Sequence, residues 1–290
     1  MEDNFLNSEI KLNRESGTYL FYGDDSQRNF SVALDFAKKL FLRDIKDENI
    51  RDEISRKIDA NIYSDLYIIE NLNIEEVRNI IKKTYTSSHE EGIKVFILKN
   101  IENIRKESAN AMLKVIEEPT QDNFFILLSN KLNILTTIKS RSIIYKVKRQ
   151  TAEELQVDKY DYDFFMGVSE DIENYKLKKL DLNSEKNFKE IYEAIKNYEE
   201  DFSIENKTDI YKCLRNFVQN SEDLKKYEKI KFAEDIFSAI SNKKVTILIV
   251  DYLLNLVKAN KNLKEKLLLK KMLRHPINMK LFFINLILTI

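Results

Sequence analysis

Short apolar runs alternate with longer amphipathic stretches through the first half of the chain. Five of the runs are rich in β-branched, aromatic and leucine side chains, as buried strands are, and they cover residues 18–22, 65–69, 94–98, 124–129 and 143–147. Between them, apolar positions recur with a helical period in residues 30–42, 74–85 and 106–118, with a short helical piece near Ile134. This alternation predicts an α/β fold in which helices cover both faces of a parallel sheet.

The pattern is helical throughout after about residue 148. Apolar residues recur with a helical period in residues 152–180, 185–200, 207–219, 222–241, 244–259, 262–273 and 276–289. The run Lys244–Val250 (KVTILIV) is ambiguous, but it continues into DYLLNLVKAN with a period near 3.6, and we interpret it as a helix. We therefore expect an all-α second half, with one domain boundary after residue 149 and a softer one after residue 202.

The composition supports this helical character and excludes some kinds of site. The 290 residues include 4 Gly and 2 Pro, where average usage would give roughly 20 and 15. The 48 basic and 48 acidic side chains cancel, so the composition itself does not favour nucleic acid as the main partner. The single cysteine, Cys213, excludes an internal disulfide and a cysteine-based zinc site, which suits a reducing cytoplasm.

Neither the first nor the last residues have the pattern of an export signal or a membrane span. The first residues, MEDNFLNSEIKLN, lack the apolar core of a signal peptide. The last apolar segment, MKLFFINLILTI, is shorter than the about 20 residues that span a bilayer. We expect a cytoplasmic protein.

The stretch after the first predicted strand has the layout of a phosphate-binding loop. Gly23 to Phe30 reads GDDSQRNF and leads into a helix, with the spacing of G-x-x-x-x-G-K-[S/T]. Arg28, Asn29 and Phe30 replace the second glycine, the lysine and the hydroxyl residue. A lysine is needed to reach the outer phosphates and a hydroxyl to ligate magnesium, so the setting of a nucleotide site remains without its ligands.

Three ordered motifs identify a family. Residues 110–119 read NAMLKVIEEP, Ser129-Asn130 ends the next predicted strand, and residues 137–142 read TIKSRS. Together they resemble the clamp-loader branch of the AAA+ proteins over about residues 15–150, and weakly beyond. The resemblance implies a RecA-like AAA+ domain at 1–149 with a degenerate phosphate loop, a helical lid at 150–202 and a helical collar, or oligomerisation, domain at 203–290.

Within this family, a second element of ATP chemistry is missing. The acidic Walker B pair should follow the third strand, but Lys99-Asn100 stands there, and Glu102 is out of register. A lysine repels magnesium, and neither residue supplies a carboxylate. We expect no hydrolysis by this chain, no bound cofactor and no metal, with the ATP held by neighbouring subunits. Asn130, at the sensor-1 position, is then only a polar residue at a strand end.

Arg141, with Ser140 and Ser142, occupies the S-R-C motif of the family, with Ser142 in place of the cysteine. Taken alone, Arg141 would be a surface arginine that closes a turn before a strand. With NAMLKVIEEP upstream, the resemblance implies an arginine finger in trans, which stabilises charge on the phosphate transferred in a neighbouring subunit.

The resemblance implies a non-hydrolysing subunit of the bacterial DNA polymerase III clamp loader, which is not an enzyme on its own but belongs to a polymerase holoenzyme. Its partners would be the gamma/tau ATPase subunits, the delta subunit and, through the complex, the sliding clamp and primed DNA, with no membrane and with a nucleoid-associated location. The alternatives are a gamma/tau-like ATPase subunit, another AAA+ remodeller, or the delta subunit, which is expected to lack the S-R-C arginine. The four-cysteine zinc module often found after the first helix is absent here, since residues 43–64 contain no cysteine.

Other polar residues have simpler interpretations. Glu117 and Glu118 are either a solvated helix end or an interface feature, because acids near a helix C-terminus oppose the helix dipole. Lys114 is a surface lysine or an interface residue. His89 and His275 match no ligand spacing, and Cys213 lies at a core position of its helix.

Overall fold

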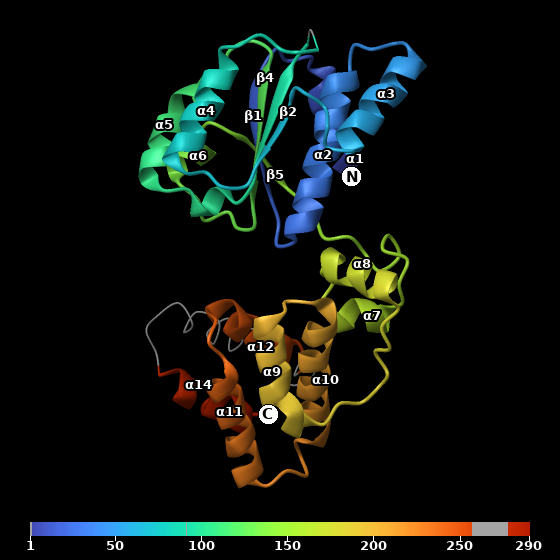
Figure 1. The fold of residues 1–290 in the computed structure, drawn as a ribbon, viewed down its shortest axis with the longest axis vertical. Coiled ribbons are helices and arrows are strands. Elements are labelled where there is room, and N and C mark those ends of the chain that lie inside the picture. The colour runs from blue at the N-terminus through green and yellow to red at the C-terminus, as the bar shows by residue number, and fades with distance from the viewer. Residues whose placement is uncertain (1, 91, 257–277) are drawn as a thin grey trace. The chain divides into compact units, whose positions relative to one another are not determined.

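The computed structural model describes residues 2–90, 92–256 and 278–290, which divide into two compact units, Met1–Gln150 and Thr151–Ile290 (Figure 1). The first unit contains a five-stranded sheet of order β2-β3-β4-β1-β5, in which every neighbouring pair is parallel. The strands are β1 Gly17–Tyr22, β2 Leu66–Ile69, β3 Lys94–Leu98, β4 Asn123–Ser129 and β5 Ile143–Lys146. Each predicted strand matches these bounds within one residue, so the predicted parallel sheet is confirmed.

Helices cover both faces of this sheet (Figure 1). One face packs against α1 Glu2–Lys11, α2 Ser26–Leu42 and α3 Glu48–Asp59, and the other against η1 Ile101–Asn103, α4 Ile74–Thr84, α5 Lys106–Glu117 and α6 Thr136–Lys139. Successive strand residues serve opposite faces, as the pleat requires. Tyr19 and Phe21 belong to the core under α2, whereas Leu20 between them belongs to the core under α4 and α5.

Helix ends follow local sequence signals. Asn73 accepts a hydrogen bond from Glu76 N at 2.8 Å, which confirms it as the N-cap of α4. The α1 and α3 helices were not predicted. A signal for α3 was present, because Ile50, Ile54 and Ile58 follow one helix face after the N-cap residue Asp47.

The second unit is helical and packs around one buried core. Its elements are α7 Lys159–Phe164, α8 Ser169–Lys178, η2 Phe188–Glu190, α9 Ile191–Glu200, α10 Ile204–Asn220, α11 Lys226–Ala239, α12 Lys243–Leu256 and α14 Met279–Leu288. The α12 helix includes the ambiguous run 244–250, so its helical interpretation is confirmed. No described helix combines the length and the hydrophobicity that crossing a membrane requires.

The prediction of one helical segment over residues 152–180 is wrong. This segment holds α7 and α8, separated by a tight turn in which Met166 and Gly167 have φ values of 55° and 67°. Gly167 N donates to Tyr162 O at 2.8 Å, and the Tyr162 ring packs where a Gly167 Cβ would stand. Only glycine combines this left-handed backbone with so close a contact, and the helix therefore ends here.

The first predicted domain boundary coincides with the division between the two units within one residue. The further division at residue 202 stays a prediction. The α9 helix, assigned to the predicted lid, packs against α10 and α11 of the predicted collar. The predicted helix 262–273 and His275 lie outside the described residues.

Candidate functional site

Three loops at the carboxyl edge of the sheet bring the predicted nucleotide-site positions together. Gly23 follows β1, Lys99 and Asn100 follow β3, and Asn130 follows β4. Because β3, β4 and β1 are adjacent and parallel, these residues share one edge, the edge where open α/β sheets bind ligands. The loops are also bonded to each other, since Gly23 N donates to Ser129 O at 3.2 Å.

An internal carboxylate occupies the amino end of α2. Asp25 is only 4% exposed and is the N-cap, and its Oδ1 accepts a hydrogen bond from Arg28 N at 3.0 Å. In a working phosphate loop, the free amides at this helix end point toward the phosphate. Here the Arg28 amide is already bonded, and the nearby carboxylate would repel a second anion.

Asn29, at the position of the phosphate-binding lysine, folds back into the loop. Its side chain is 1% exposed, and its Nδ2 donates to Gly23 O at 2.8 Å and to Ser129 O at 3.1 Å. A Cβ at Gly23 would lie only 2.7 Å from Asn29 Oδ1 and 2.8 Å from Val147 O. The start of this loop is therefore closely packed against Asn29 and Val147.

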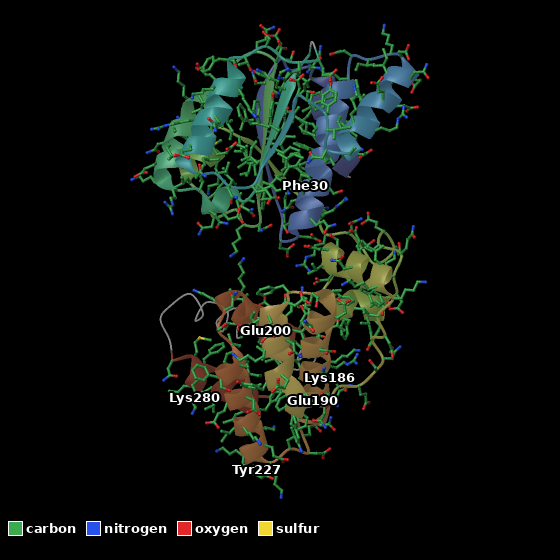
Figure 2. All side chains as sticks on the ribbon, viewed as in Figure 1. Phe30, Lys186, Glu190, Glu200, Tyr227 and Lys280 are labelled. Atoms are coloured by element: carbon green, nitrogen blue, oxygen red, sulfur yellow. The ribbon has the colours of Figure 1, made fainter. Side chains whose placement is uncertain are left out.

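Phe30 and Lys99, which replace the hydroxyl and carboxylate residues of a magnesium site, are in contact. Phe30 lies near the start of α2 (Figure 2), and Lys99 Nζ is 4.1 Å from the centroid of its ring. The same ammonium is 2.7 Å from Oε1 of Glu70, just beyond β2, and its hydrogen bond and charge lower the Glu70 pKa. A cation of the chain itself thus lies where the motif would supply oxygen ligands for magnesium.

The backbone of Asn130, at the sensor-1 position, is held by a residue outside the motifs. Asn130 N donates to Glu102 Oε1 at 3.2 Å, and Glu102 belongs to the short helix η1 after β3. Asn100 precedes η1 with a left-handed backbone (φ 56°) and is exposed. Glu102 therefore joins the loops that follow β3 and β4.

Asp24 is also paired within the loop region, with Arg149. Arg149 Nε donates to Asp24 Oδ1 at 2.9 Å. Burial raises the pKa of Asp24, but the hydrogen bond and charge of Arg149 outweigh it, and the net pKa is lowered. Nothing in the sequence around either residue indicated this contact, because they lie at opposite ends of the first unit.

Arg141 lies away from this carboxyl edge. It follows α6 and precedes β5, and β5 is parallel to β1 with Ile143 paired to Tyr19. Tyr19 stands three residues before the last residue of β1, which places Ile143 about 10 Å back from that edge. The topology therefore separates Arg141 from the loop Gly23–Phe30 of its own chain.

Two groups of the first unit hold the Arg141 guanidinium. Its Nη1 donates to Thr137 O at 3.1 Å, and its Nε lies 2.7 Å from Oε2 of Glu117, the last residue of α5. The Glu117 contact is an ion pair and not a directed hydrogen bond, since Arg141 Nε has no hydrogen-bond partner among the described residues. The Arg141 side chain remains 27% exposed.

Ser140 and Ser142 fix the turn that carries Arg141. Ser140 Oγ donates to Thr137 O at 3.2 Å, and Ser142 Oγ donates to Ile138 O at 2.9 Å. Both hydroxyls bond the backbone of α6, as serines at helix ends often do. The replacement of the family's cysteine by Ser142 thus has a local structural use.

The other polar residues singled out by sequence have structural contacts. His89 N donates to both carboxylate oxygens of Asp65 at 2.9–3.0 Å. Cys213 is fully buried, which confirms it as a core thiol, and burial raises its pKa to about 12. In the part of the chain that the structure describes, no group of three or more His, Cys, Asp or Glu side chains could hold a metal.

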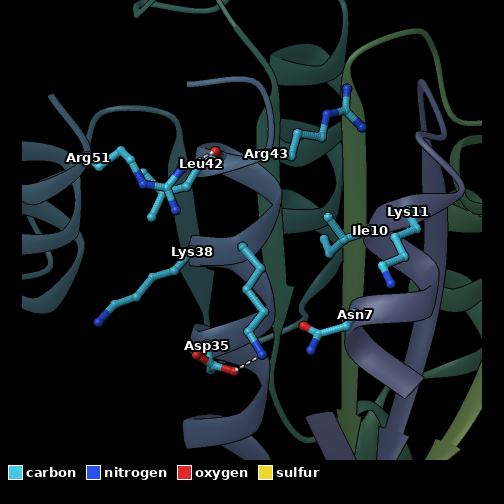
Figure 3. A pocket seen from close by; sticks show the side chains of 9 residues that line it. Asn7, Ile10, Lys11, Asp35, Lys38, Leu42, Arg43 and Arg51 are labelled. Carbon is cyan, nitrogen blue, oxygen red and sulfur yellow. Dashed lines mark hydrogen bonds and ion pairs between the residues drawn. The ribbon is translucent and has the colours of Figure 1, made fainter. Parts of the chain in front are cut away.

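A cationic pocket of about 390 Å³ lies apart from the site, between α1, α2 and α3 (Figure 3). Most of its charges are already matched. Lys39 pairs with Asp35 at 3.1 Å, Lys38 pairs with Asp59, and Arg51 donates to Leu42 O at 2.8 Å. We assign it no function.

The arrangement defines a class of protein. A parallel sheet of this order, a loop and helix after β1, and a helical second unit form the clamp-loader type of AAA+ fold, as the sequence predicts. A family model described as "DNA polymerase III, delta subunit" matches residues 3–151, and the chain belongs to this family.

Similar proteins include the DNA polymerase III subunit delta' of Buchnera aphidicola subsp. Schizaphis graminum, 24% identical over 72% of this chain and 60% of that protein. The delta' subunit of Bacillus subtilis is 26% identical over 47% of this chain and 43% of its own length. The matches thus span 60% or less of these curated relatives. A solved DNA polymerase III gamma subunit-related protein of Thermotoga maritima shares the fold, with a TM-score of 0.58, 18% identity, and coverage of 98% of this chain and 97% of that one.

Proposed function

We propose that this chain is a delta'-like subunit of a DNA polymerase III clamp loader that holds no nucleotide and supplies Arg141 to ATP bound by a neighbouring subunit. The observation that carries the proposal is that Asp25, Asn29, Phe30 and Lys99, at the positions of the phosphate-loop and Walker B motifs, are engaged in contacts within the chain. Membership of the family supplies the setting, and relatives named delta' support the particular subunit.

Binding of MgATP to this site would undo several contacts at once. The triphosphate would meet the Asp25 carboxylate at the helix end, and magnesium would meet the Lys99 ammonium. Freeing Asn29 would break two hydrogen bonds, each worth about 1 kcal/mol. These contacts disfavour the alternative of a gamma/tau-like ATPase subunit or another hydrolysing AAA+ remodeller.

The position of Arg141 supports action on a neighbour. It stands away from its own carboxyl edge, and its side chain is partly exposed. Leu132 and Leu135, in the connection between β4 and α6, are large apolar side chains that are each 38% exposed. Exposed apolar side chains and arginines are both common at protein interfaces.

The proposed partners are those of the loader. The gamma/tau subunits would hold the ATP and the delta subunit would complete the ring, which would then act on the sliding clamp and primed DNA in the cytoplasm. The chain itself would serve as an assembly subunit without a cofactor. Any contact with DNA would be indirect, or directed to phosphates through helix N-termini and lysine side chains.

The decisive experiment reconstitutes the loader with its partner subunits and compares Arg141→Ala with the unchanged chain. The other ATP sites carry inactivating substitutions, so that only the site next to this subunit turns over. We expect intact assembly and DNA-stimulated turnover lower by about 10²-fold or more, because a trans arginine is worth ~10³–10⁵ in rate. Arg141→Lys should recover little, since lysine keeps the charge but loses the planar fork.

Arg78→Ala is the matched control. Arg78 is an exposed arginine of α4 in the same unit, and its loss should leave turnover unchanged. If Arg141→Ala also turns over normally at the isolated site, the finger role is wrong. If the complex fails to assemble, Arg141 acts in subunit contact, and the proposed catalytic role is rejected.

A further inference from the structure

We infer that Glu117 is a positioning residue for Arg141, which holds the guanidinium in the orientation that meets a neighbouring phosphate. The inference rests on the proposed function. It arises from one contact, the 2.7 Å ion pair between Arg141 Nε and Glu117 Oε2, which links two elements that are packed together but separate in sequence.

The contact holds one side of the guanidinium. Thr137 O accepts from Nη1, and the Glu117 carboxylate lies against Nε. The third nitrogen, Nη2, makes no hydrogen bond to any residue the structure describes. The arginine is therefore anchored through two nitrogens, and the N–H groups of Nη2 are left for an oxygen that the described residues of this unit do not supply.

Local stability does not explain the placement of Glu117. An acid in the last turn opposes the helix dipole, and α5 ends at this residue. The Glu117 side chain is 51% exposed, and exposed ion pairs contribute little to stability because solvent screens them. A carboxylate at this position therefore contributes little to folding, whereas its contact fixes Arg141.

The benefit of the pair is preorganisation. A free arginine side chain loses rotamer entropy when it is immobilised. In this structure Glu117 and Thr137 restrict the side chain before any neighbour arrives. Without Glu117, one hydrogen bond and the long 3.5 Å contact with Ser140 Oγ would remain, and the guanidinium would sample other rotamers.

The neighbouring acid is a matched control. Glu118 is the C-cap residue of α5, exposed like Glu117, with the same charge and one position further along. It forms no ion pair or side-chain hydrogen bond with any described residue. An effect of general charge near the interface would appear in both variants, whereas a positioning effect would appear only at Glu117.

The test uses the reconstituted loader with a single active ATP site beside this subunit, and compares Glu117→Ala, Glu117→Gln and Glu118→Ala, alone and with Arg141→Ala. We expect Glu117→Ala to lower kcat by about tenfold, since slight misplacement of a positioning group can cost as much as 10²-fold, with the KM for ATP nearly unchanged. Glu117→Gln should retain part of the activity, and Glu118→Ala all of it. In the Arg141→Ala background, the loss of Glu117 should have no further effect.

The possible results distinguish the positioning role of Glu117 from the proposed finger role of Arg141. If Arg141→Ala lowers turnover but Glu117→Ala does not, the finger role of Arg141 is supported and the positioning role of Glu117 is wrong. Higher turnover for Glu117→Ala would mean that Glu117 restrains the arginine, which also overturns the inference. An equal loss with and without Arg141 would show an independent structural role, which thermal unfolding of the isolated variant would reveal. No effect of Arg141→Ala rejects both.

Discussion

The ammonium of Lys99 lies 4.1 Å from the centre of the Phe30 ring, so the two residues that replace magnesium ligands contact each other. The same ammonium forms an ion pair with Glu70 at 2.7 Å. Lys99, at the Walker B position of the motif, is therefore engaged in two contacts within the chain. This relationship, together with the capped α2 and the buried Asn29, leads to several expected outcomes.

Restoring the phosphate-loop lysine should harm the protein. Asn29→Lys removes the bonds to Gly23 O and Ser129 O and places a charge at a position that is 1% exposed. We expect a loss of about 2–4 kcal/mol in the free energy of unfolding, measured by urea denaturation, without any gain of ATP binding. Ser31→Lys adds the same charge at an exposed position of α2 and should change stability by less than about 0.5 kcal/mol.

Gly23 should tolerate no side chain, because its surroundings leave no room for a Cβ. Gly23→Ala would place a Cβ 2.7 Å from Asn29 Oδ1 and 2.8 Å from the Val147 carbonyl oxygen. We expect a loss of about 1–3 kcal/mol in unfolding free energy, because the backbone must shift. The control is Gly92→Ala, whose Cβ would meet nothing closer than 3.9 Å. Equal stability of the two variants would contradict the packing described for the loop.

Glu70 should titrate below an ordinary glutamate. The hydrogen bond and charge of Lys99 lower its pKa, from a usual value of about 4.3. Any stability from the pair is therefore present above that usual pKa and is lost as pH falls through the lowered one. NMR titration of the Glu70 carboxyl should show the low pKa, and Lys99→Met should raise it toward the usual value. Lys114→Met, which removes an exposed lysine of α5, should leave it unchanged.

Cys213 should be inert in the folded protein. Burial raises the pKa of its thiol to about 12, so almost no thiolate exists at pH 8. We expect no reaction with a thiol reagent in native buffer and complete reaction in denaturant. Ser87→Cys adds a thiol at an exposed position and should react rapidly in both conditions. Rapid native labelling of the unchanged chain would mean that α10 is not packed as described.

The sheet and most helices could be predicted because their patterns are local. Continuous apolar runs mark buried parallel strands, and an N-cap such as Asn73 marks a helix start. The break between α7 and α8 was missed because it depends on the Tyr162 ring, which leaves room only for glycine at position 167. No periodicity in 152–180 indicates that contact.

The sequence located the residues of the candidate site but did not indicate their contacts. The motif spacing singled out Asn29, Phe30 and Lys99, and the structure places them in loops at the carboxyl edge of the sheet or at the start of α2; that they remove ATP chemistry stays a prediction. That Lys99 contacts Phe30 and Glu70 depends on the order of β1, β2 and β3 in the sheet. The Glu117 and Arg141 pair likewise joins two motifs that the sequence places 24 positions apart.

Calorimetric titration of the isolated chain with MgATP tests the central claim most directly, that this chain holds no nucleotide. We predict no saturable binding up to about 1 mM, a concentration at which a Kd of that size would be evident. Saturable binding in the micromolar range, weakened when Asn29 or Lys99 is replaced, would contradict that claim.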